Sequence, residues 1–483
     1  MDALAFEHHL LSPQGFDRLP ENGFAVTAGG AECCDQIRLS VSVRGGRVEA
    51  AGFVAHGCGA ATAAGSAAVT LARGRPLVEV ARLGPNEIAA ELGGLSPAKR
   101  HAAELASDAL ARALGAAARA KAELPRPEGG RTLVAMSGGV DSAVAALRCA
   151  QAGDTVAVTL ELWSDPENDA EQSCCSASAV AQARALAHAM GLPHLTIDLR
   201  DEFRAGVVEP FIAGYAAGET PNPCVGCNGH VRLDAMLALA DRLGCDRLAT
   251  GHYARMDEVD HDEGPLLRVA TDQSKDQTYM LAALSPSSLA RMRFPLGELT
   301  KPEVRLIASE AGLPVANKAD SQDLCFLAGT DRGRFLARHG GLGDRSGAIV
   351  DRGGNELGRH RGQHRFTVGQ RRGLGVSGAE PLYVLDKDAA SNRVTVGPAT
   401  ALRTTTVRLR GARLHRSGCR VDRVKLRYRS RPLTAWLPGD PPVGRHRSLE
   451  LELGEDADAA VPGQLACLMD GDRVIGWGTV TRR

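Results

Sequence analysis

A short apolar strand that runs directly into a glycine-rich turn and then into a helix is the feature that most constrains the fold of this chain. Residues 132–136 form the apolar run, residues 137–142 read Ser-Gly-Gly-Val-Asp-Ser, and an apolar helical pattern follows over 143–150. Paired glycines allow a tight turn with inward-pointing N–H groups, and the N-terminus of the next helix is electropositive. The segment therefore predicts a phosphate-binding loop. It differs from a Walker loop, which would need Gly-Lys-Ser/Thr after a four-residue spacer.

The region over 131–338 alternates short strand patterns with helical stretches. The predicted strands cover 132–136, 155–162, 194–199 and 246–250. Strands separated by helices pair in parallel through βαβ crossovers, and such sheets bind their ligands at the carboxyl ends of the strands. We therefore predict the α/β fold class, with a doubly wound parallel sheet in this domain.

Different patterns flank this region on both sides. Residues 1–122 begin with β-like alternation and continue with alanine-rich helical patterns, which predicts an α+β domain, and 123–130 has the composition of a linker. Further along the chain, the helical pattern gives way to short runs in which apolar and polar residues alternate, separated by glycines. We expect a central β-rich domain over 339–404 and a C-terminal β-barrel domain over 405–483.

The amino-acid composition limits which partners the protein can bind and in which cellular compartment we expect it. The formal net charge is zero over 483 residues, so a polyanion must be bound by local basic patches, of which 352–372 and 425–431 are examples. The chain has no window of about eighteen apolar residues and no signal-peptide pattern, so we expect a cytoplasmic protein without membrane contact. In that reducing compartment the twelve cysteines favour metal binding or thiol chemistry over structural disulphides.

Four further motifs carry chemistry. Thr-Pro-Asn-Pro-Cys-Val-Gly-Cys-Asn at 220–228 presents two thiols on a loop stiffened by prolines, and Ser-Gln-Asp-Leu-Cys-Phe at 321–326 presents another. Gly-His-Tyr-Ala-Arg at 251–255 follows a predicted strand, where a glycine allows close approach to a nucleotide, and Ser-Lys-Asp-Gln at 274–277 places a lysine in a polar turn. Taken singly these are weak signals, because a Cys-x-x-Cys pair has metal, redox and incidental explanations and an exposed Lys–Asp pair contributes little energy.

These motifs, with Phe-Thr-Val-Gly-Gln-Arg at 366–371, occur in the order and spacing of the tRNA-specific 2-thiouridylases, and residues 131–483 resemble that family. The strand-loop-helix likewise resembles the pyrophosphatase loop of enzymes that split ATP into AMP and pyrophosphate. The resemblance implies that ATP, with Mg²⁺, drives replacement of the 2-oxygen of the tRNA wobble uridine by sulphur. It implies ATP contacts from Ala135, Met136, Ser137, Gly138, Gly139, Val140, Asp141, Ser142, Leu160 and Gly251, and tRNA contacts from Asn222, Pro223, Cys224, Lys275, Asp276, Gln277, Arg427 and Tyr428.

The resemblance also assigns the sulphur chemistry. Adenylation turns the uracil oxygen into a leaving group, since it departs with AMP, and sulphur then attacks. Cys325 resembles the catalytic position that carries the incoming persulphide, and Cys227 resembles the partner thiol that releases sulphur through a transient disulphide. Many family members carry aspartate at Cys224, so Cys224, Cys227 and Cys325 are also a candidate ligand set for an iron-sulphur cluster that holds a sulphide. We favour the persulphide route, and the sequence leaves the cluster route open.

Residues 1–122 lie outside that family and resemble the U-type iron-sulphur cluster scaffold. Cys-Cys-Asp at 33–35, Gly-Cys at 57–58 and Lys-Arg-His-Ala at 99–102 stand where the scaffold has Cys-Gly-Asp, Gly-Cys and Lys-x-His-Cys, so Ala102 replaces the third cysteine. A metal-free docking module is therefore one interpretation, and a zinc or iron-cluster site is the other. The candidate metal ligands are Cys33, Asp35, Cys58 and His101. Fusion to a thiolating enzyme suggests local delivery of sulphur or of a cluster.

The sequence is also compatible with two other functions. Another ATP pyrophosphatase, such as an amidating ligase, would need a glutaminase or amino-acid site and would have no use for Cys227 and Cys325. An iron-sulphur carrier with an ATP-sensing domain would transfer clusters without forming AMP. For the leading function we expect two partners, a tRNA with a wobble uridine and a sulphur-donor protein, either a cysteine desulphurase or a relay.

Overall fold

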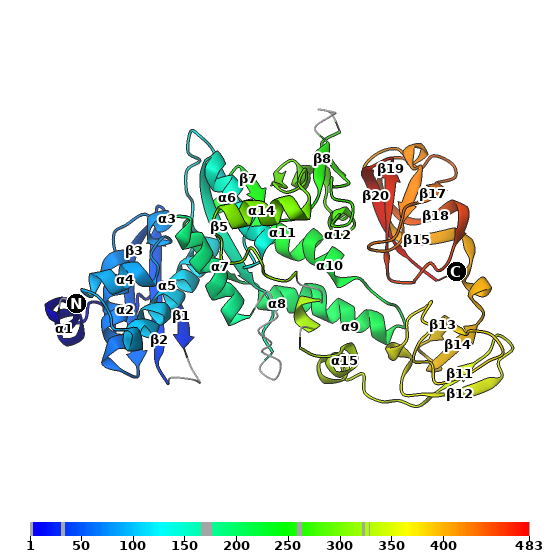
Figure 1. Cartoon of the computed structure of the whole chain (residues 1–483), viewed down its shortest axis with the longest axis horizontal. Coiled ribbons are helices and arrows are strands. Elements are labelled where there is room, and N and C mark those ends of the chain that lie inside the picture. Colours follow the sequence, from blue (N-terminus) through cyan, green and yellow to red (C-terminus); the bar gives the residue numbers. More distant parts are fainter. Residues whose placement is uncertain are drawn as a thin grey trace.

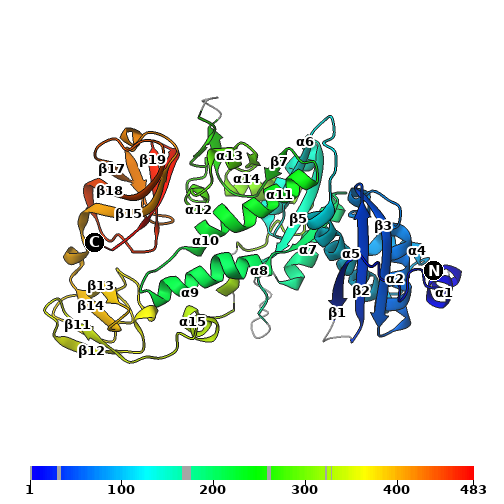
Figure 2. The same cartoon turned by 180° about the vertical axis from the view of Figure 1, so that it is seen from behind.

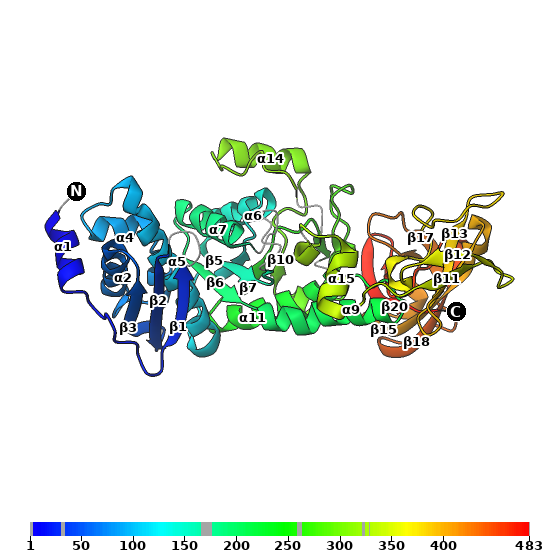
Figure 3. The ribbon, with the colours of Figure 1, turned by 90° about the horizontal axis from the view of Figure 1, so that it is seen from below.

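The computed structural model describes residues 3–29, 34–165, 176–257, 263–320, 324–327 and 329–482. The N-terminal domain lies at one end of an elongated molecule, the α/β domain lies in the middle, and two β-rich modules lie at the other end (Figures 1 and 3). None of the helices within these ranges is both long enough and apolar enough to cross a membrane.

The N-terminal domain packs helices on an antiparallel sheet with strand order β1-β2-β3. Side chains of β2 alternate between buried and exposed along much of the strand, because one face of the sheet packs against helices and the other faces solvent. Small alanines on α2 and α5 allow both helices to approach the sheet closely. The elements are α1 (Ala3–Leu11), β1 (Phe24–Gly29), β2 (Gln36–Arg44), β3 (Arg47–His56), α2 (Gly59–Ala72), α3 (Leu77–Val80), α4 (Pro85–Glu91) and α5 (Arg100–Lys121).

The middle domain is built on a fully parallel sheet with strand order β10-β7-β4-β5-β6, which confirms the predicted α/β fold class. Helices α6 and α7 lie on one face of the sheet and α11 lies on the other, and this double coverage explains why β5 is buried at nearly every position (Figure 3). The strands are β4 (Arg131–Ala135), β5 (Asp154–Glu161), β6 (His194–Asp198), β7 (Arg247–Ala249) and β10 (Met292–Arg293). Helices of this domain include α6 (Val140–Ala152), α7 (Ala177–Ala189), α11 (Leu233–Arg242), α12 (Thr278–Leu281), α13 (Pro286–Leu289), α14 (Lys301–Glu310) and α15 (Arg332–Gly340).

Helix α5 of the N-terminal domain covers the edge strand β6 of this sheet. The backbone N–H of His194 donates to the carbonyl of Ala81 at 2.8 Å. A Cβ added at Gly115 of α5 would collide with the carbonyl oxygen of Thr196 in β6, so the helix and the strand are in backbone contact. The edge strand is therefore protected by the N-terminal domain.

Two long helices of the α/β domain contain π-helical turns. One is continuous through α8 (Arg200–Phe203), the π turn Arg204–Val208 and α9 (Glu209–Ala216). The other is continuous through α10 (Pro223–Gly226), the π turn Cys227–Arg232 and α11 (Leu233–Arg242). Both run from the α/β domain toward the β-rich end of the molecule, as seen from opposite sides in Figures 1 and 2. Turns of this type occur frequently at functional sites.

The β-rich end contains a small sheet and a closed barrel. The sheet has the order β12-β11-β14-β13, and the barrel closes because β15 pairs with both β18 and β20. A hairpin from the α/β domain, β8–β9, adds to the barrel sheet through β9 and β20. The strands are β8 (Arg255–Asp257), β9 (Leu266–Arg268), β11 (Gly347–Val350), β12 (Glu356–His360), β13 (Tyr383–Asp388), β14 (Arg393–Gly397), β15 (Thr404–Leu414), β16 (Arg423–Lys425), β17 (Leu433–Trp436), β18 (Gly444–Ala457), β19 (Leu465–Asp470) and β20 (Arg473–Val480).

Candidate functional site

The predicted phosphate loop connects the carboxyl end of β4 to the N-terminus of α6. Gly138 has a φ of +71°, and a Cβ at this position would lie 2.9 Å from the carbonyl oxygen of Ala179, so both its conformation and its surroundings favour glycine. The Ser142 hydroxyl donates to the Gly139 carbonyl at 3.0 Å and accepts from the Ser137 N–H at 3.1 Å. The two serines therefore hold the loop in its turn. The ATP-binding residues predicted over 135–142 all lie on this strand end, loop and first helical turn.

The two other predicted ATP contacts lie on the strands next to β4. Gly251 follows β7, and a Cβ added there would lie 2.8 Å from the backbone nitrogen of Ser142, so the two backbones touch. Leu160 lies near the end of β5 and is largely buried. Because β4 lies between β5 and β7, these positions flank the phosphate loop at one edge of the sheet. The arrangement matches the ligand-binding edge of a doubly wound fold.

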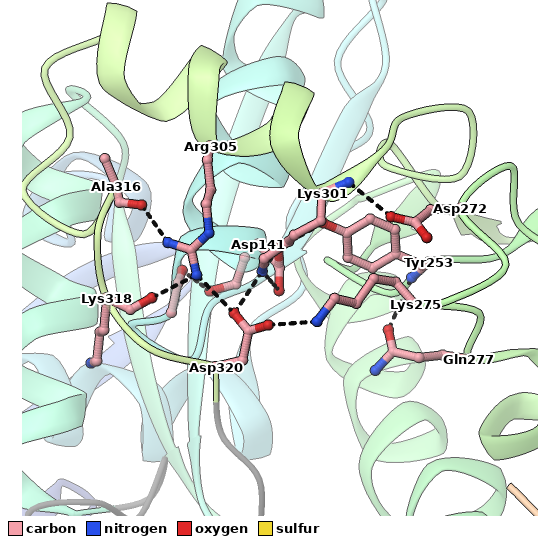
Figure 4. Close-up of polar contacts among 12 residues, drawn as sticks. Asp141, Tyr253, Asp272, Lys275, Gln277, Lys301, Arg305, Ala316, Lys318 and Asp320 are labelled. Carbon is pink, nitrogen blue, oxygen red and sulfur yellow. Dashed lines mark hydrogen bonds and ion pairs between the residues drawn. The ribbon is translucent and has the colours of Figure 1, made fainter. Parts of the chain in front are cut away.

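A set of charged residues from distant parts of the sequence surrounds Asp141 of the loop (Figure 4). The ammonium of Lys301, at the start of α14, lies 2.7 and 2.8 Å from the two carboxylate oxygens of Asp141 and 2.8 Å from Oδ1 of Asp320. Lys275 binds Oδ2 of Asp320 at 2.8 Å. The Tyr253 hydroxyl donates to Oδ1 of Asp141 at 2.9 Å. Two carboxylates and two ammonium groups thus form one connected network.

The electrostatics of the network change the pKa values of Asp320 and Tyr253. Burial alone would raise the pKa of Asp320, but hydrogen bonds and charges from Lys275 and Lys301 outweigh burial and lower it to about 2. Burial beside Asp141 raises the pKa of Tyr253, so its hydroxyl keeps its proton and remains a donor. Lys318 adds a further cation, whose ammonium donates to the Gly138 carbonyl at 3.0 Å. This side of the loop therefore gathers three of the seven lysines in the chain.

Lys275 was predicted from the sequence, whereas Lys301, Lys318 and Asp320 were not. The available signal was the rarity of lysine, with only seven in the chain, together with the Thr-Lys-Pro-Glu start of a capped helix at 300–303. Thr300 and Glu303 form a capping box that fixes the first turn of α14. That turn determines the position from which the Lys301 side chain reaches Asp141.

The predicted base-contact residues lie at the start of α10. Asn222 is the N-cap, and its Oδ1 accepts from the Cys224 N–H at 3.1 Å. Pro223 occupies the first helical position, where a missing N–H costs nothing. Cys224 is partly exposed, whereas Cys227 is buried and begins the π turn. The proline-stiffened loop and the cap together fix how this cysteine pair is presented.

Cys325 begins a short 3₁₀ turn, Cys325–Leu327, that is anchored by its neighbour. The ring of Phe326 packs against Phe203, Phe211 and Phe335, with ring centroids 5.9, 5.1 and 5.1 Å away. Cys227 belongs to the same hydrophobic cluster against which Cys325 packs. The motif residues 321–323 lie outside the described ranges.

The three predicted cluster ligands do not form a single-ion site. Within the described part of the chain, only Asp35, Cys58 and His101 bring three ligand atoms of this kind within 4.8 Å of one another. Cys224, Cys227 and Cys325 form no such group.

The residues predicted to contact tRNA around position 276 have structural partners. Asp276 is 5 % exposed, its carboxylate accepts from the Thr278 hydroxyl, and Lys425 of the barrel lies 3.2 Å from its Oδ2. Oε1 of Gln277 accepts from the Tyr253 N–H at 3.0 Å. Asp276 therefore joins the α/β domain to the barrel, and Gln277 holds the backbone of Tyr253 beside the phosphate loop.

Two predicted tRNA contacts on the barrel lie beside α12. Arg427 donates to the Ala459 carbonyl at 3.2 Å. The ring of Tyr428 lies 6.4 Å from the ring of Tyr279 on α12, and the guanidinium of Arg429 lies 5.3 Å from the Tyr428 ring. This aromatic and basic surface therefore adjoins the α/β domain.

The N-terminal domain contains the group Asp35, Cys58 and His101. Oδ2 of Asp35 lies 2.8 Å from Nε2 of His101 and accepts from the Cys58 thiol at 3.1 Å. Nδ1 of His101 lies 3.0 Å from the Ala98 carbonyl, an arrangement that leaves Nε2 to face a ligand. Hydrogen bonds from His101 and Cys58 outweigh burial and lower the pKa of Asp35. A carboxylate, a thiol and an imidazole form a donor set that suits zinc or iron.

Glycine makes this arrangement possible. Gly57 has a φ of +122°, and a Cβ there would collide with Oδ1 of Asp35. Cys33, the fourth predicted ligand, lies outside the described residues. Ala102 is fully buried in the first turn of α5. The described residues therefore supply three ligand atoms for this site.

Three family models match the chain. The model described as "tRNA methyl transferase HUP domain" matches residues 130–329, and the one described as "tRNA methyl transferase PRC-barrel domain" matches 333–398. The model described as "NifU-like N terminal domain" matches 6–123. The three matched ranges follow one another along the chain between residues 6 and 398.

Curated relatives match at high coverage. "Bifunctional protein NifU/MnmA" of Rubrobacter xylanophilus is 42 % identical over 489 residues, which cover 98 % of this chain and 97 % of the relative. "tRNA-specific 2-thiouridylase MnmA" of Acidobacterium capsulatum is 42 % identical over 369 residues, covering 72 % of this chain and 98 % of the relative. The protein of the same name from Acidithiobacillus ferrooxidans is 42 % identical over 356 residues, again with 72 % and 98 % coverage.

Proposed function

This chain belongs to the family that joins a NifU-like domain to a tRNA-specific 2-thiouridylase. On that premise we propose that it replaces the 2-oxygen of the wobble uridine of tRNA by sulphur in an ATP-dependent reaction. The observation that carries the proposal is the phosphate loop at 137–142, with its left-handed Gly138 and the touching backbone of Gly251. Such a loop binds a triphosphate, and the family relationship supplies the acceptor.

The first step requires charge stabilisation at the phosphates. The uracil 2-oxygen attacks the α-phosphorus of ATP, the bond to the bridging oxygen breaks, and pyrophosphate leaves. The backbone N–H groups of the loop and the ammonium groups of Lys275, Lys301 and Lys318 are the groups placed to stabilise that leaving charge. Binding of the triphosphate with Mg²⁺ would compete with the existing contact between Lys301 and Asp141, so we expect this ion pair to rearrange when ATP binds.

The second step transfers sulphur. A persulphide on Cys325 attacks C2 of the adenylated uridine through its terminal sulphur, and the C2–O bond breaks to release AMP. The Cys227 thiolate then attacks the Cys325 sulphur, which leaves the outer sulphur on C2 as 2-thiouridine and joins the two cysteines in a disulphide. A dithiol reductant restores both thiols.

The N-terminal domain supports a role in supplying sulphur or metal to this reaction. Its Asp35, Cys58 and His101 form a donor set for zinc or iron, and a sulphur-donor protein is the expected partner of the persulphide step. The basic patches at 352–372 and 425–431 are the expected contacts for tRNA, whose binding should weaken as salt increases.

Mass spectrometry of tRNA nucleosides tests the proposal. Cells that lack the protein should lose wobble 2-thiouridine, and the wild-type chain should restore it. Cys227→Ser and Cys325→Ser should fail to restore it while retaining ATP binding, whereas Cys419→Ser, on the exposed surface of the barrel, should behave as wild type. Unchanged 2-thiouridine in the deletion strain would refute the assignment.

Iron content separates the persulphide route from the cluster route. The full chain carrying Cys58→Ser, which lacks a ligand of the N-terminal group, should be purified without oxygen. If it is free of iron and still thiolates tRNA when given persulphide, the cluster route is excluded. Activity proportional to bound iron, and loss of both with Cys224→Ala, would exclude the persulphide route.

A further inference from the structure

The segment that leads from α9 to the base-contact loop is bound by the two C-terminal modules. Residues 215–220 end α9 and precede the Pro-Asn-Pro-Cys sequence, and each of their six consecutive carbonyl groups accepts a hydrogen bond from a side chain of the small sheet module or the barrel module. Gln363 donates to the carbonyls of Tyr215 at 3.1 Å and Ala216 at 3.4 Å. Figures 1 and 2 show the end of α9 directed at the β13–β14 sheet.

The remaining four carbonyls have donors from both modules. Arg482, at the end of the barrel, donates to the carbonyls of Ala217 at 3.3 Å and Gly218 at 3.4 Å. Lys387 of β13 donates to the carbonyl of Glu219 at 3.4 Å and to that of Phe366 at 2.8 Å. Gln464 donates to the carbonyl of Thr220 at 2.6 Å, and the Thr220 N–H donates to Pro462 at 2.9 Å.

The chemistry of these contacts indicates that they position the 215–220 backbone and do not only hold the C-terminal modules against the α/β domain. Lys387 is 1 % exposed, and burial together with Arg332 and Arg482 lowers its pKa to about 7. A buried amine lowers stability relative to an apolar side chain of the same size unless hydrogen bonds compensate. Directional bonds from side chains to a backbone fix where that backbone lies, and either protonation state of Lys387 retains N–H donors.

The bound segment has little freedom to absorb a displacement before it reaches the thiols. Pro221 and Pro223 restrict the backbone on both sides of Asn222, and a Cβ added at Gly214 of α9 would lie 2.8 Å from Cγ of Pro221. Asn222 caps α10, which carries Cys224 and leads into Cys227. A movement of the C-terminal modules is therefore transmitted to the cysteine pair.

We propose that Gln363, Lys387, Gln464 and Arg482 are positioning residues that place the base-contact loop and its cysteines according to how the two C-terminal modules sit on tRNA. This proposal rests on the proposed function for its substrate. It predicts a loss in the rate of thiolation with little loss in tRNA binding, because these side chains act on the loop through its backbone.

Two substitutions of similar volume test the role, Lys387→Met and Gln464→Leu. Hydrogen exchange of the amides over 215–224 should accelerate about tenfold or more, and kcat for tRNA thiolation should fall by about the same factor while KM for tRNA stays within about threefold. Arg420→Met, which removes a surface ion pair with Asp470 elsewhere on the barrel, is the matched control and should change neither quantity. Arg482→Met, at a partly exposed position, provides the same test should the buried substitutions impair folding.

The outcomes separate this inference from the function itself. Unchanged exchange over 215–224 in the variants, or a loss that appears only in KM, would overturn the positioning role while the wild type still thiolates tRNA. A wild-type chain that never thiolates tRNA would refute the proposed function, and the exchange comparison would still report whether the four side chains hold the segment.

Discussion

Arg112, in the middle of helix α5 of the N-terminal domain, is hydrogen-bonded to the carboxylate of Glu161, the last residue of strand β5 in the α/β domain. The same guanidinium binds Asp108 one turn earlier at 2.8 Å, and Asp108 in turn binds Arg184 of α7 at 2.6 Å. Glu161 directly follows Leu160, one of the predicted adenosine contacts. The N-terminal domain is thus joined by a largely buried ionic network to the edge of the nucleotide pocket.

We expect Arg112→Met to destabilise the junction by about 3 kcal/mol, because Glu161 would remain buried without its cation. Calorimetry should show a fall of several degrees in the unfolding temperature. The double variant Arg112→Met, Glu161→Leu should recover most of that loss, since no isolated charge remains. Arg44→Met, at a surface ion pair with Glu49, is the control and should change stability by less than about 0.5 kcal/mol.

Removing residues 1–122 should expose the edge strand β6. That strand would lose the contact between Gly115 and Thr196 and the hydrogen bond from His194 to Ala81. An uncovered edge strand pairs readily with other chains, so the truncated protein should elute as oligomers or aggregates in size-exclusion chromatography. A monodisperse truncated chain with full activity would show that α5 is dispensable for the sheet.

Lys301→Met should lower the rate of AMP formation by about 10²-fold, because it removes a cation placed beside the phosphate loop and leaves Asp141 and Asp320 facing each other. The rate of AMP formation by Lys301→Arg should lie between the rates of this variant and the wild type, since a guanidinium keeps the charge but has a different shape. Lys121→Met, at the exposed end of α5, serves as the control. Single-turnover measurements with labelled ATP distinguish a loss of chemistry from a loss of binding.

The pKa of Asp320 predicts a defined pH dependence. A carboxyl group whose pKa falls on folding from 3.8 to about 2 stabilises the folded state at pH values above 3.8, and this contribution is lost as the pH falls toward 2. Asp320→Asn should therefore lower the unfolding temperature at pH 7 and change it little near pH 2. An equal effect at both pH values would contradict the assignment of this carboxylate to the lysine network.

The full chain should bind zinc through its N-terminal domain. Cys58→Ser and His101→Gln should each abolish tight binding, because each removes one of three ligand atoms gathered within 4.8 Å. Binding should release protons, since the thiol must ionise to become a ligand. His56→Gln, an exposed histidine at the end of β3, should leave the affinity unchanged when it is measured by competition with a chelator. Retention of zinc by both ligand variants would place the site elsewhere.

The sequence predicted those elements that are determined by residues close to one another in the chain. Residues 132–142 combine a strand, a glycine turn and a helix start within eleven positions, so the phosphate loop could be located from pattern alone. Alternation of period two likewise predicted strands within residues 1–122, where β2 lies, and within 405–483, where β18 lies. Each of these signals depends on neighbours in sequence.

Contacts between distant segments could not be predicted in the same way. Lys301 reaches Asp141 across 160 positions, and its role depends on where α14 packs. Asp276 was predicted to contact tRNA, and the structure shows its carboxylate buried against Lys425, which no local pattern indicates. The β8–β9 hairpin lies inside the α/β segment of the sequence but pairs with the barrel sheet. This pairing also results from tertiary packing.

The hairpin has a consequence for the order of events during synthesis. β9 pairs with Arg473 and Val474 of β20, which are synthesised roughly 200 residues later. At synthesis rates of about 5–20 residues per second, β9 therefore remains without this neighbour for about 10–40 s. Until then its edge, and Arg268 that later binds Asp472, remain without those partners. The barrel is therefore completed only after β20 has left the ribosome, and a message truncated before β20 would leave both the barrel and the α/β domain with an open strand edge.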